Sequence, residues 1–230
     1  MKKQLLIFDL DGTLVDSSED LCNAINYAIE PLSVKPITID DTKRLVGEGI
    51  SKLIDKLIKE KGIEFSDKDI LERFLSFYNN HLLDHTKPYP EVIETLNRLN
   101  NFKKAVVTNK RTDMSREILR GLSMEHFFEL IVGSDTTGFK KPSAVPLLYV
   151  LDKLKISPED AIIIGDSMYD IEAGKASNIS TIAVSYGFRP ADTLKDADFI
   201  IDNFSHILNI LNINRDPSIS LSLFRSGAMC

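Results

Sequence analysis

Six short apolar runs, each bounded by polar or turn residues, restrict the fold of this chain more than any other feature. They lie at residues 5–8, 105–107, 130–132, 161–164, 181–184 and 199–201. Within each run the apolar residues are consecutive and do not alternate with polar ones, which is typical of strands covered on both faces. Because the runs lie among segments with helical periodicity, we predict an α/β fold: a Rossmann-like three-layer sandwich with a parallel sheet.

A long interval without any strand pattern separates the first run from the second. Residues 16–85 instead carry two apolar stripes with helical spacing. One stripe is Ile50, Leu53, Ile54, Leu57 and Ile58, and the other is Ile70, Leu71, Phe74, Leu75, Tyr78 and Leu82. Because this interval exceeds any ordinary connection between strands, we interpret residues 16–85 as a helical cap inserted into a discontinuous catalytic core of residues 1–15 and 86–212.

Two other segments help to bound this core. Pro90 suits the first turn of a helix that we predict at residues 91–99, where the chain returns from the cap. Residues 213–230 change in character, with serines interleaved with apolar residues, and we interpret them as a C-terminal tail that is frayed or packed.

The charge and the cysteine content exclude several classes of protein. The chain has 28 Lys and Arg residues against 34 Asp and Glu residues, a net charge of -6, which is not the basic footprint of a nucleic-acid binder. The N-terminal apolar run reaches Asp9 too soon for a signal peptide, and no stretch approaches a membrane span. Of the two cysteines, Cys22 is interpreted as a small core residue and Cys230 lies at the chain end. We therefore expect a cytoplasmic protein with neither nucleic acid nor membrane as a partner.

Two carboxylates lie where the first predicted strand ends, in the run Asp-Leu-Asp-Gly-Thr that follows Phe8. Open parallel sheets bind ligands at the carboxyl ends of their strands. In an extended stretch Asp9 and Asp11 point to the same side, and Gly12 brings backbone N–H groups close to a ligand. A surface Asp-Gly turn that merely ends the strand is the alternative interpretation.

The fourth predicted strand repeats this pattern, because a glycine and then Asp166 and Asp170 follow it. If Asp166 joins Asp9 and Asp11 at one edge, their mutual repulsion is costly without a cation. Oxygen ligands of this kind suit Mg²⁺, so we predict a magnesium site. Asp170 is either a further contributor to that site or a carboxylate that the dipole of the following helix favours.

Two further segments supply groups that suit an anionic ligand. Thr108 and Asn109 follow the second predicted strand, and Lys141 lies near the start of a predicted helix at residues 144–154. We predict that these three residues and Gly12 contact a phosphate group. Each segment also has a plainer interpretation, since Thr and Asn are common capping residues and most lysines are simply solvated.

The order of these segments resembles the haloacid dehalogenase-like superfamily of phosphohydrolases. The order is a carboxylate pair, Thr-Asn, Lys-Pro and Gly-Asp-Ser-x-x-Asp, and the resemblance covers residues 1–212. It implies that Asp9 is the nucleophile and Asp11 the general acid and base. It further implies that Thr108 binds phosphate and that Lys141 is the lysine of the third motif.

The resemblance also implies a metal site and a type of reaction. Mg²⁺ would be held by Asp9, Asp166 and the backbone carbonyl of Asp11, with Asp170 nearby. Dehalogenases of the superfamily lack an aspartate at the position of Asp11, so phosphoryl transfer is implied. Residues 45–50 look like the glycine-bearing cap loop of phosphoglycolate phosphatases. The expected function is therefore Mg²⁺-dependent hydrolysis of a small phosphomonoester, such as 2-phosphoglycolate, through an aspartyl-phosphate.

Several points stay open at this level. A β-phosphoglucomutase-like phosphomutase or a pyrophosphatase of the same fold would share these residues. A non-catalytic binding module would not need a nucleophile and an acid together. Gly47, Glu48 and Gly49 either contact the non-phosphate end of the substrate or form a helix-entry turn. His81 and His85, four residues apart, are interpreted as a solvated helix face, not a metal pair, and the chain is expected to be a monomer or a homodimer.

Overall fold

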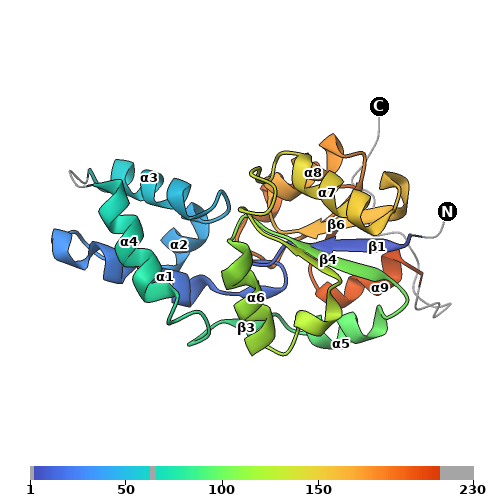
Figure 1. The fold of residues 1–230 in the computed structure, drawn as a ribbon, viewed down its shortest axis with the longest axis horizontal. Helices are drawn as coiled ribbons and strands as arrows, with labels where there is room; N and C mark the ends of the chain where they lie inside the picture. Colours follow the sequence, from blue (N-terminus) through green and yellow to red (C-terminus); the bar gives the residue numbers. More distant parts are fainter. Residues whose placement is uncertain (1–2, 63–65, 213–230) are drawn as a thin grey trace.

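A six-stranded parallel sheet forms the centre of the protein, for which a computed structural model describes residues 3–62 and 66–212 (Figure 1). The strand order is β5-β4-β1-β6-β7-β8. The strands are β1 (Leu5–Phe8), β4 (Lys103–Val107), β5 (Leu130–Val132), β6 (Ala161–Gly165), β7 (Ser180–Val184) and β8 (Phe199–Ile201). Each contains one of the six apolar runs, so the predicted strands and the parallel sheet are confirmed.

Helices cover both faces of this sheet. Leu5 and Ile7 of β1 belong to one apolar cluster, whereas Leu6 and Phe8 belong to another. The first cluster includes buried residues of α7 (Val145–Leu154) and α8 (Met168–Ala176), and the second includes those of α5 (Val92–Arg98), α6 (Thr112–Gly121) and α9 (Ile207–Ile210). Figure 1 shows the first pair of helices above the sheet and the other three below it. The predicted three-layer α/β sandwich is confirmed, and the strand β1 is apolar along its whole length because its residues are buried on one face or the other.

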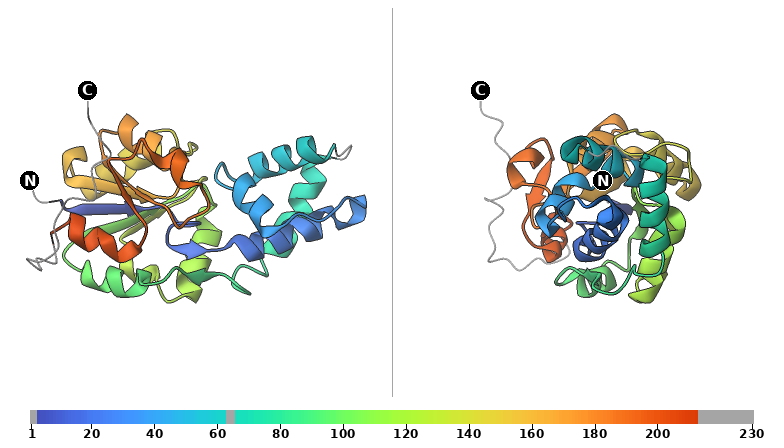
Figure 2. Two further views of the ribbon diagram at one scale, coloured as in Figure 1. Left: turned by 180° about the vertical axis from the view of Figure 1, so that it is seen from behind. Right: turned by 90° about the vertical axis from the view of Figure 1, so that its left-hand side faces the viewer.

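A second group of helices lies beyond one edge of the sandwich. They are α1 (Ser18–Ile29), α2 (Ile39–Leu45), α3 (Ile50–Lys61) and α4 (Asp67–Tyr78). Figures 1 and 2 show them as a separate body next to the sheet. The chain leaves the core and returns to it through a two-stranded antiparallel ribbon of β2 (Val15–Asp16) and β3 (Lys87–Pro88). The division into a core of 1–15 plus 86–212 and a cap of 16–85 stays a prediction, and this ribbon lies at its boundary.

The apolar stripes of the cap pack against one another. Leu53, Ile54 and Leu57 of α3 and Ile70 and Phe74 of α4 are buried. Each buried aliphatic or aromatic side chain of this kind contributes about 1.5–3 kcal/mol relative to exposure in water. The α3 helix ends at a glycine in the left-handed region, residue 62, which has a φ of 60°.

Two helical predictions need correction. The helix at 91–99 begins only at Val92, because Glu91 has a left-handed φ of 62° and cannot continue a helix. His81 and His85 share no helix face, since α4 ends at Tyr78. The non-helical conformation at His85 has a partner in Asp20, whose carboxylate accepts the backbone N–H of His85 at 3.0 Å. This hydrogen bond takes the place of one within a helix.

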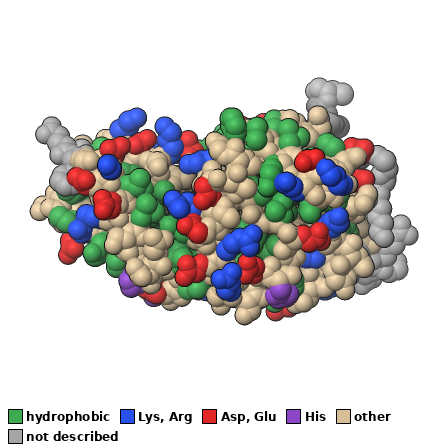
Figure 3. Space-filling view, in the orientation of Figure 1, with side chains coloured by type: hydrophobic (Ala, Val, Ile, Leu, Met, Phe, Trp, Pro, Cys, Tyr) green, Lys and Arg blue, Asp and Glu red, His purple; other side chains and the backbone are tan. Residues whose placement is uncertain are grey.

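The remaining elements are short 3₁₀ turns. They comprise η1 (Glu30–Leu32), η2 (Glu125–Phe127), η3 (Pro158–Asp160), η4 (Ala191–Leu194) and η5 (Phe204–His206). Cys22 is buried, as predicted, whereas Cys230 and the predicted tail at 213–230 lie outside the described residues. No helix in the described part of the chain has both the length and the apolar character to cross a bilayer. Basic and acidic side chains are interspersed on the face in Figure 3.

Candidate active site

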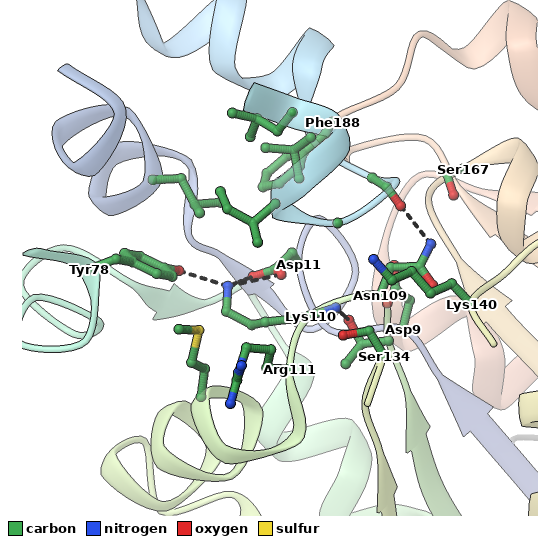
Figure 4. Close-up of a pocket in the computed structure, with 18 of the residues that line it drawn as sticks. Asp9, Asp11, Tyr78, Asn109, Lys110, Arg111, Ser134, Lys140, Ser167 and Phe188 are labelled. Atoms are coloured by element: carbon green, nitrogen blue, oxygen red, sulfur yellow. Dashed lines mark hydrogen bonds and ion pairs between the residues drawn. The ribbon is translucent and has the colours of Figure 1, made fainter. Parts of the chain in front are cut away.

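The carboxyl ends of three adjacent strands meet at the edge of the sheet that faces the cap. β1 pairs with β4 on one side and with β6 on the other. The residues that follow these strands therefore lie close together, and one pocket is lined by Asp9, Asp11, Thr108, Asn109 and Asp166 (Figure 4). The structure thus brings together most of the residues singled out in the sequence.

Asp9 is held directly at the end of β1. Its backbone N–H donates to the carbonyl of Ile164 at 2.9 Å, which continues the pairing with β6. Its carboxylate oxygen Oδ1 lies 2.9 Å from Lys141 Nζ, and the Lys141 side chain is only 2% exposed. Burial raises the pKa of Asp9 to about 6, although the charge of Lys141 opposes this rise. The arrangement places a carboxylate next to a cation, the geometry in which it can attack an anionic phosphorus centre.

Lys141 bridges two carboxylates. Its ammonium lies 2.5 Å from Asp170 Oδ1 as well as close to Asp9. Burial acts to lower the pKa of Lys141, but the negative charges of Asp170 and Asp9 outweigh it and the pKa is raised. Lys141 therefore stays protonated in a buried position because both neighbours are acidic.

Asp170 has all of its carboxylate engaged by protein donors. Its Oδ2 accepts the backbone N–H and the hydroxyl of Ser167, at 3.2 and 2.6 Å, in a capping box at the start of α8. Its other oxygen holds Lys141. Asp170 thus lies in the first turn of α8, as its helix-terminal interpretation expects, and also orients the lysine beside the nucleophile, whereas its contribution to a magnesium site stays a prediction.

Asn109 clamps the backbone around Lys141. Its side-chain oxygen accepts the N–H of Lys141, and its amide donates to the carbonyl of Lys141, each at 2.9 Å. The same amide donates to the carbonyl of Gly47 in the cap at 2.8 Å. The phosphate contact expected of Asn109 stays a prediction, and in this structure its amide binds backbone groups.

Three aspartates form an acidic cluster deep in the site. Asp9, Asp166 and Asp170 each offer a carboxylate oxygen, and these atoms lie within 4.8 Å of one another. Burial, followed by the negative charges of Asp9 and Asp170, raises the pKa of Asp166 well above its usual range. A Cβ on Gly12 would lie 2.3 Å from Asp166 Oδ2, so only glycine allows this approach. Oxygen donors crowded in this way fit a small divalent cation such as Mg²⁺.

Asp11 is held by two residues that the sequence analysis did not select. Lys110 Nζ lies 3.1 Å from both carboxylate oxygens, and Ser17 donates its hydroxyl to Oδ1 at 2.5 Å. Tyr78, at the end of α4, lies 2.7 Å from Lys110 through its hydroxyl (Figure 4). Burial acts to lower the pKa of Lys110, but Asp11 and Tyr78 outweigh it and raise the pKa. A cap residue is thereby linked to the predicted general acid and base.

Thr108 lies at the end of β4 with its hydroxyl near the pocket. Its backbone N–H donates to the carbonyl of Val132 at 3.0 Å, which continues the pairing with β5. The hydroxyl oxygen accepts the N–H of Lys110 at 3.2 Å, which leaves its own hydrogen available for donation to a ligand. Thr108 is 4% exposed, so a bound oxygen would be largely shielded from water.

The glycine-bearing cap loop docks on the core. Gly47 and Gly49 line the pocket, and a Cβ on Gly47 would lie 2.8 Å from Arg189 Nη2. Glu48 points to other partners, because it accepts the hydroxyl of Tyr169 at 2.8 Å and pairs with Lys56. The two hydrogen bonds lower the pKa of Glu48.

Arg189 fastens the same loop from the core side. Its guanidinium donates to the backbone carbonyls of Lys43, Arg44 and Val46 near the end of α2. Arg189 and Tyr169 were absent from the sequence analysis, since a partner on a distant loop leaves no local pattern.

The fold is a three-layer α/β sandwich, and its site holds a carboxylate, a lysine and a hydroxyl at one edge of the sheet, an arrangement that suits a phosphohydrolase. The model of the haloacid dehalogenase-like hydrolase family matches residues 6–184. The chain belongs to this family, and within it resembles the phosphoglycolate phosphatases.

Several known proteins are similar over most of their length. A phosphoglycolate phosphatase of Aquifex aeolicus is 36% identical, over 91% of this chain and 97% of the relative. One of Chromobacterium violaceum is 38% identical, over 89% and 94%. Among solved structures, a predicted phosphoglycolate phosphatase from Haemophilus somnus superposes with a TM-score of 0.85 at 30% identity, covering 91% of this chain and 98% of that one.

Proposed function

We propose that this phosphatase hydrolyses 2-phosphoglycolate, or a closely similar small phosphomonoester, through an aspartyl-phosphate on Asp9 and with Mg²⁺. The observation that carries the proposal is the contact between the half-buried carboxylate of Asp9 and the buried ammonium of Lys141, 2.9 Å apart. A binding module would gain nothing from a nucleophile held against a buried cation. The substrate is supported by the names of the similar proteins and by the cap that covers the pocket.

The residues present fit the metal. Asp9, Asp166 and the backbone carbonyl of Asp11 would hold Mg²⁺, with Asp170 beside them. Bound there, Mg²⁺ supplies positive charge that offsets the repulsion between the attacking carboxylate and the phosphoryl oxygens. Each like-charge pair near 4 Å costs on the order of 4 kcal/mol near a protein surface.

The side chains of the site divide the work of the first step. Asp9 attacks phosphorus in line with the departing oxygen, so that a bond forms from a carboxylate oxygen to phosphorus while the ester bond breaks. Lys141 and Thr108 hold the non-bridging oxygens. Asp11, when protonated, donates its proton to the leaving alkoxide.

The second step returns Asp9 to its starting state. Water attacks the phosphorus of the aspartyl-phosphate, the bond between phosphorus and the Asp9 carboxylate oxygen breaks to release phosphate, and Asp11 accepts a proton from that water. In the structure Asp11 accepts hydrogen bonds from Ser17 and Lys110. Proton donation in the first step therefore requires a weaker contact with Lys110.

Phosphate release from a panel of esters tests the proposal. The panel contains 2-phosphoglycolate, sugar phosphates, nucleoside monophosphates and pyrophosphate, with either Mg²⁺ or EDTA. We expect release that is fastest with 2-phosphoglycolate, is abolished by EDTA, and falls on the order of a thousandfold or more in Asp9→Asn. Asp152→Asn, an exposed carboxylate on α7, is the matched control.

Other outcomes would point elsewhere. Release that survives in Asp9→Asn would contradict the covalent mechanism. Conversion of a sugar phosphate to its isomer without free phosphate would indicate a phosphomutase, and preference for pyrophosphate would indicate a pyrophosphatase.

A further inference from the structure

Four basic side chains line the pocket in the described part of the chain. They are Lys110, Arg111, Lys140 and Arg189. The proposed substrate carries a carboxylate in addition to its phosphate, and burial of an unpaired carboxylate is costly. The question is therefore which of the four cations is available to the carboxylate.

Three of these cations are already engaged. Lys110 is bound to Asp11 at 3.1 Å, and Arg111 pairs with Asp113 at 3.1 Å. Arg189 donates to backbone carbonyls of the cap loop. A substrate could reach these groups only by displacing an existing partner.

Lys140 differs from the other three. Within residues 3–62 and 66–212 its ammonium has no hydrogen-bond or ion-pair partner, although it lines the pocket and is partly buried. Glu48 is the acidic residue of the facing cap loop, but it is engaged by Lys56 and Tyr169. The first turn of α3, which begins beside Lys140, contains no acidic residue. The counter-charge for Lys140 is thus not supplied by these neighbours.

Lys140 belongs to the core and lies at its boundary with the cap. It precedes Lys141, which contacts the nucleophile, and Figure 4 shows it beside Asn109 and on the same side of the pocket as Asp9. A Cβ on Gly49 would lie 2.8 Å from Lys140 Nζ, so the absence of a side chain at Gly49 makes room for the ammonium.

The wall formed by the cap is apolar. It is lined by Leu21, Ile50, Leu53, Phe74 and Leu75. A carboxylate placed against these side chains would lose water without gaining a partner, which is unfavourable. The charged end of a short phosphate ester is therefore better placed on the side where Lys140 lies than against the apolar wall.

We propose that Lys140 is a specificity-determining residue that binds the carboxylate of the leaving group. Two consecutive lysines then serve opposite ends of the substrate, since Lys141 holds the phosphoryl end and Lys140 the carboxylate end. This inference rests on the proposed function. It adds that the enzyme selects anionic esters over neutral ones of the same length.

Binding measurements test the proposal separately from turnover. The Asp9→Asn protein is titrated calorimetrically, in the presence of Mg²⁺, with 2-phosphoglycolate and with 2-hydroxyethyl phosphate, which has the same number of carbons and a neutral hydroxymethyl group in place of the carboxylate. The same titrations are made after adding Lys140→Met, which keeps the length of the side chain, or Lys140→Arg, which keeps the charge. Lys52→Met, an exposed lysine of the cap, is the matched control.

We expect Lys140→Met to weaken 2-phosphoglycolate binding on the order of 10- to 100-fold, which is the effect of one charge-assisted contact. Binding of 2-hydroxyethyl phosphate should fall much less, and Lys140→Arg should retain most of the preference. Thermal unfolding of each variant checks that the protein is folded.

The two proposals fail in distinguishable ways. Equal weakening of both ligands would overturn the inference, because Lys140 would then act on the phosphate. Unchanged binding of both ligands would overturn it as well. If the binding preference depends on Lys140 but the wild-type enzyme releases no phosphate from 2-phosphoglycolate, the inference stands and the proposed function is wrong.

Discussion

The core and the cap use different structural means to contribute to one pocket. In the core, Asp9 and Thr108 follow strands that are hydrogen-bonded to neighbouring strands, and their own backbone N–H groups continue that pairing. In the cap, the backbone hydrogen bonds of each helix interior run within that helix. The cap reaches the core through side-chain contacts such as those of Asn109, Arg189 and Tyr78.

This difference separates the groups that must be rigid from those that can move. Misplacement of a nucleophile by about 1 Å can cost on the order of a hundredfold in rate, so a position at a strand end suits Asp9. A polar contact between cap and core contributes only about 0.5–1.5 kcal/mol net, so a few such contacts can break and re-form. We therefore expect the cap to open for substrate exchange while the sheet edge keeps its geometry.

The largest effect is expected from a change within the core. Lys141→Met removes the cation between Asp9 and Asp170 and leaves the buried carboxylate of Asp170 and the half-buried one of Asp9 without this counter-charge. We expect phosphate release to fall on the order of a thousandfold and the free energy of unfolding to fall by about 3–5 kcal/mol. Phosphate release and urea unfolding measure the two effects.

The control for this change is Lys175→Met, an exposed lysine on α8. A Lys141→Met enzyme within tenfold of the wild type would show that the core does not depend on this cation. The core would then not be the part of the molecule on which catalysis depends most.

An intermediate effect is expected at the contact between cap and core. Tyr78→Phe removes the hydroxyl bound to Lys110 but keeps the ring, whose centroid lies 5.2 Å from that of Phe74. We expect kcat/KM to fall about 3- to 30-fold, because Lys110 then holds Asp11 without support from the cap. Steady-state kinetics measure this, with Tyr149→Phe on α7 as a control outside the pocket.

An unchanged kcat/KM in Tyr78→Phe would mean that the cap does not influence Asp11. A loss as large as that in Lys141→Met would mean that this cap contact is as essential as the core. Either result would contradict the view that the core holds the nucleophile while the cap has a smaller effect on catalysis.

The smallest effect is expected on the surface of the cap. Arg44 pairs with Glu60 at 2.6 Å between α2 and α3, with side chains 55% and 42% exposed. Arg44→Gln should lower the free energy of unfolding by less than about 1 kcal/mol. The loss should shrink further in high salt, because exposed charges are screened. A loss above about 2 kcal/mol in urea unfolding would show that surface charge, more than the apolar stripes, holds the cap together.

Much of the site followed from the sequence because it depends on local patterns. An apolar run that ends in a carboxylate marks a strand end, and parallel strands bring such ends to one edge. Asp9 and Asp166 were therefore expected to lie close together, and their carboxylates do so. The helix at 91–99 began later than predicted because Glu91 adopts a left-handed conformation, which propensity alone does not reveal.

The residues that sequence reasoning missed act through partners far along the chain. Lys110 contacts Asp11 and Tyr78, and Arg189 contacts carbonyls near residue 45. Lys110 directly follows Thr108 and Asn109, so its position next to predicted site residues was the one sequence feature that pointed to a role in the site. Nothing local distinguishes such a lysine from a solvated one.

The sequence by itself determined the parallel sheet, the inserted helices and the set of residues at the strand ends. It could do so because strand period, strand direction and the position of polar groups after a strand are properties of short segments. Only the tertiary structure decided which cations are paired and that, among the described residues, the pocket cation Lys140 is left available. Pairing is decided there because the strength of a charge contact depends on distance and burial, and both arise only when separate segments pack together.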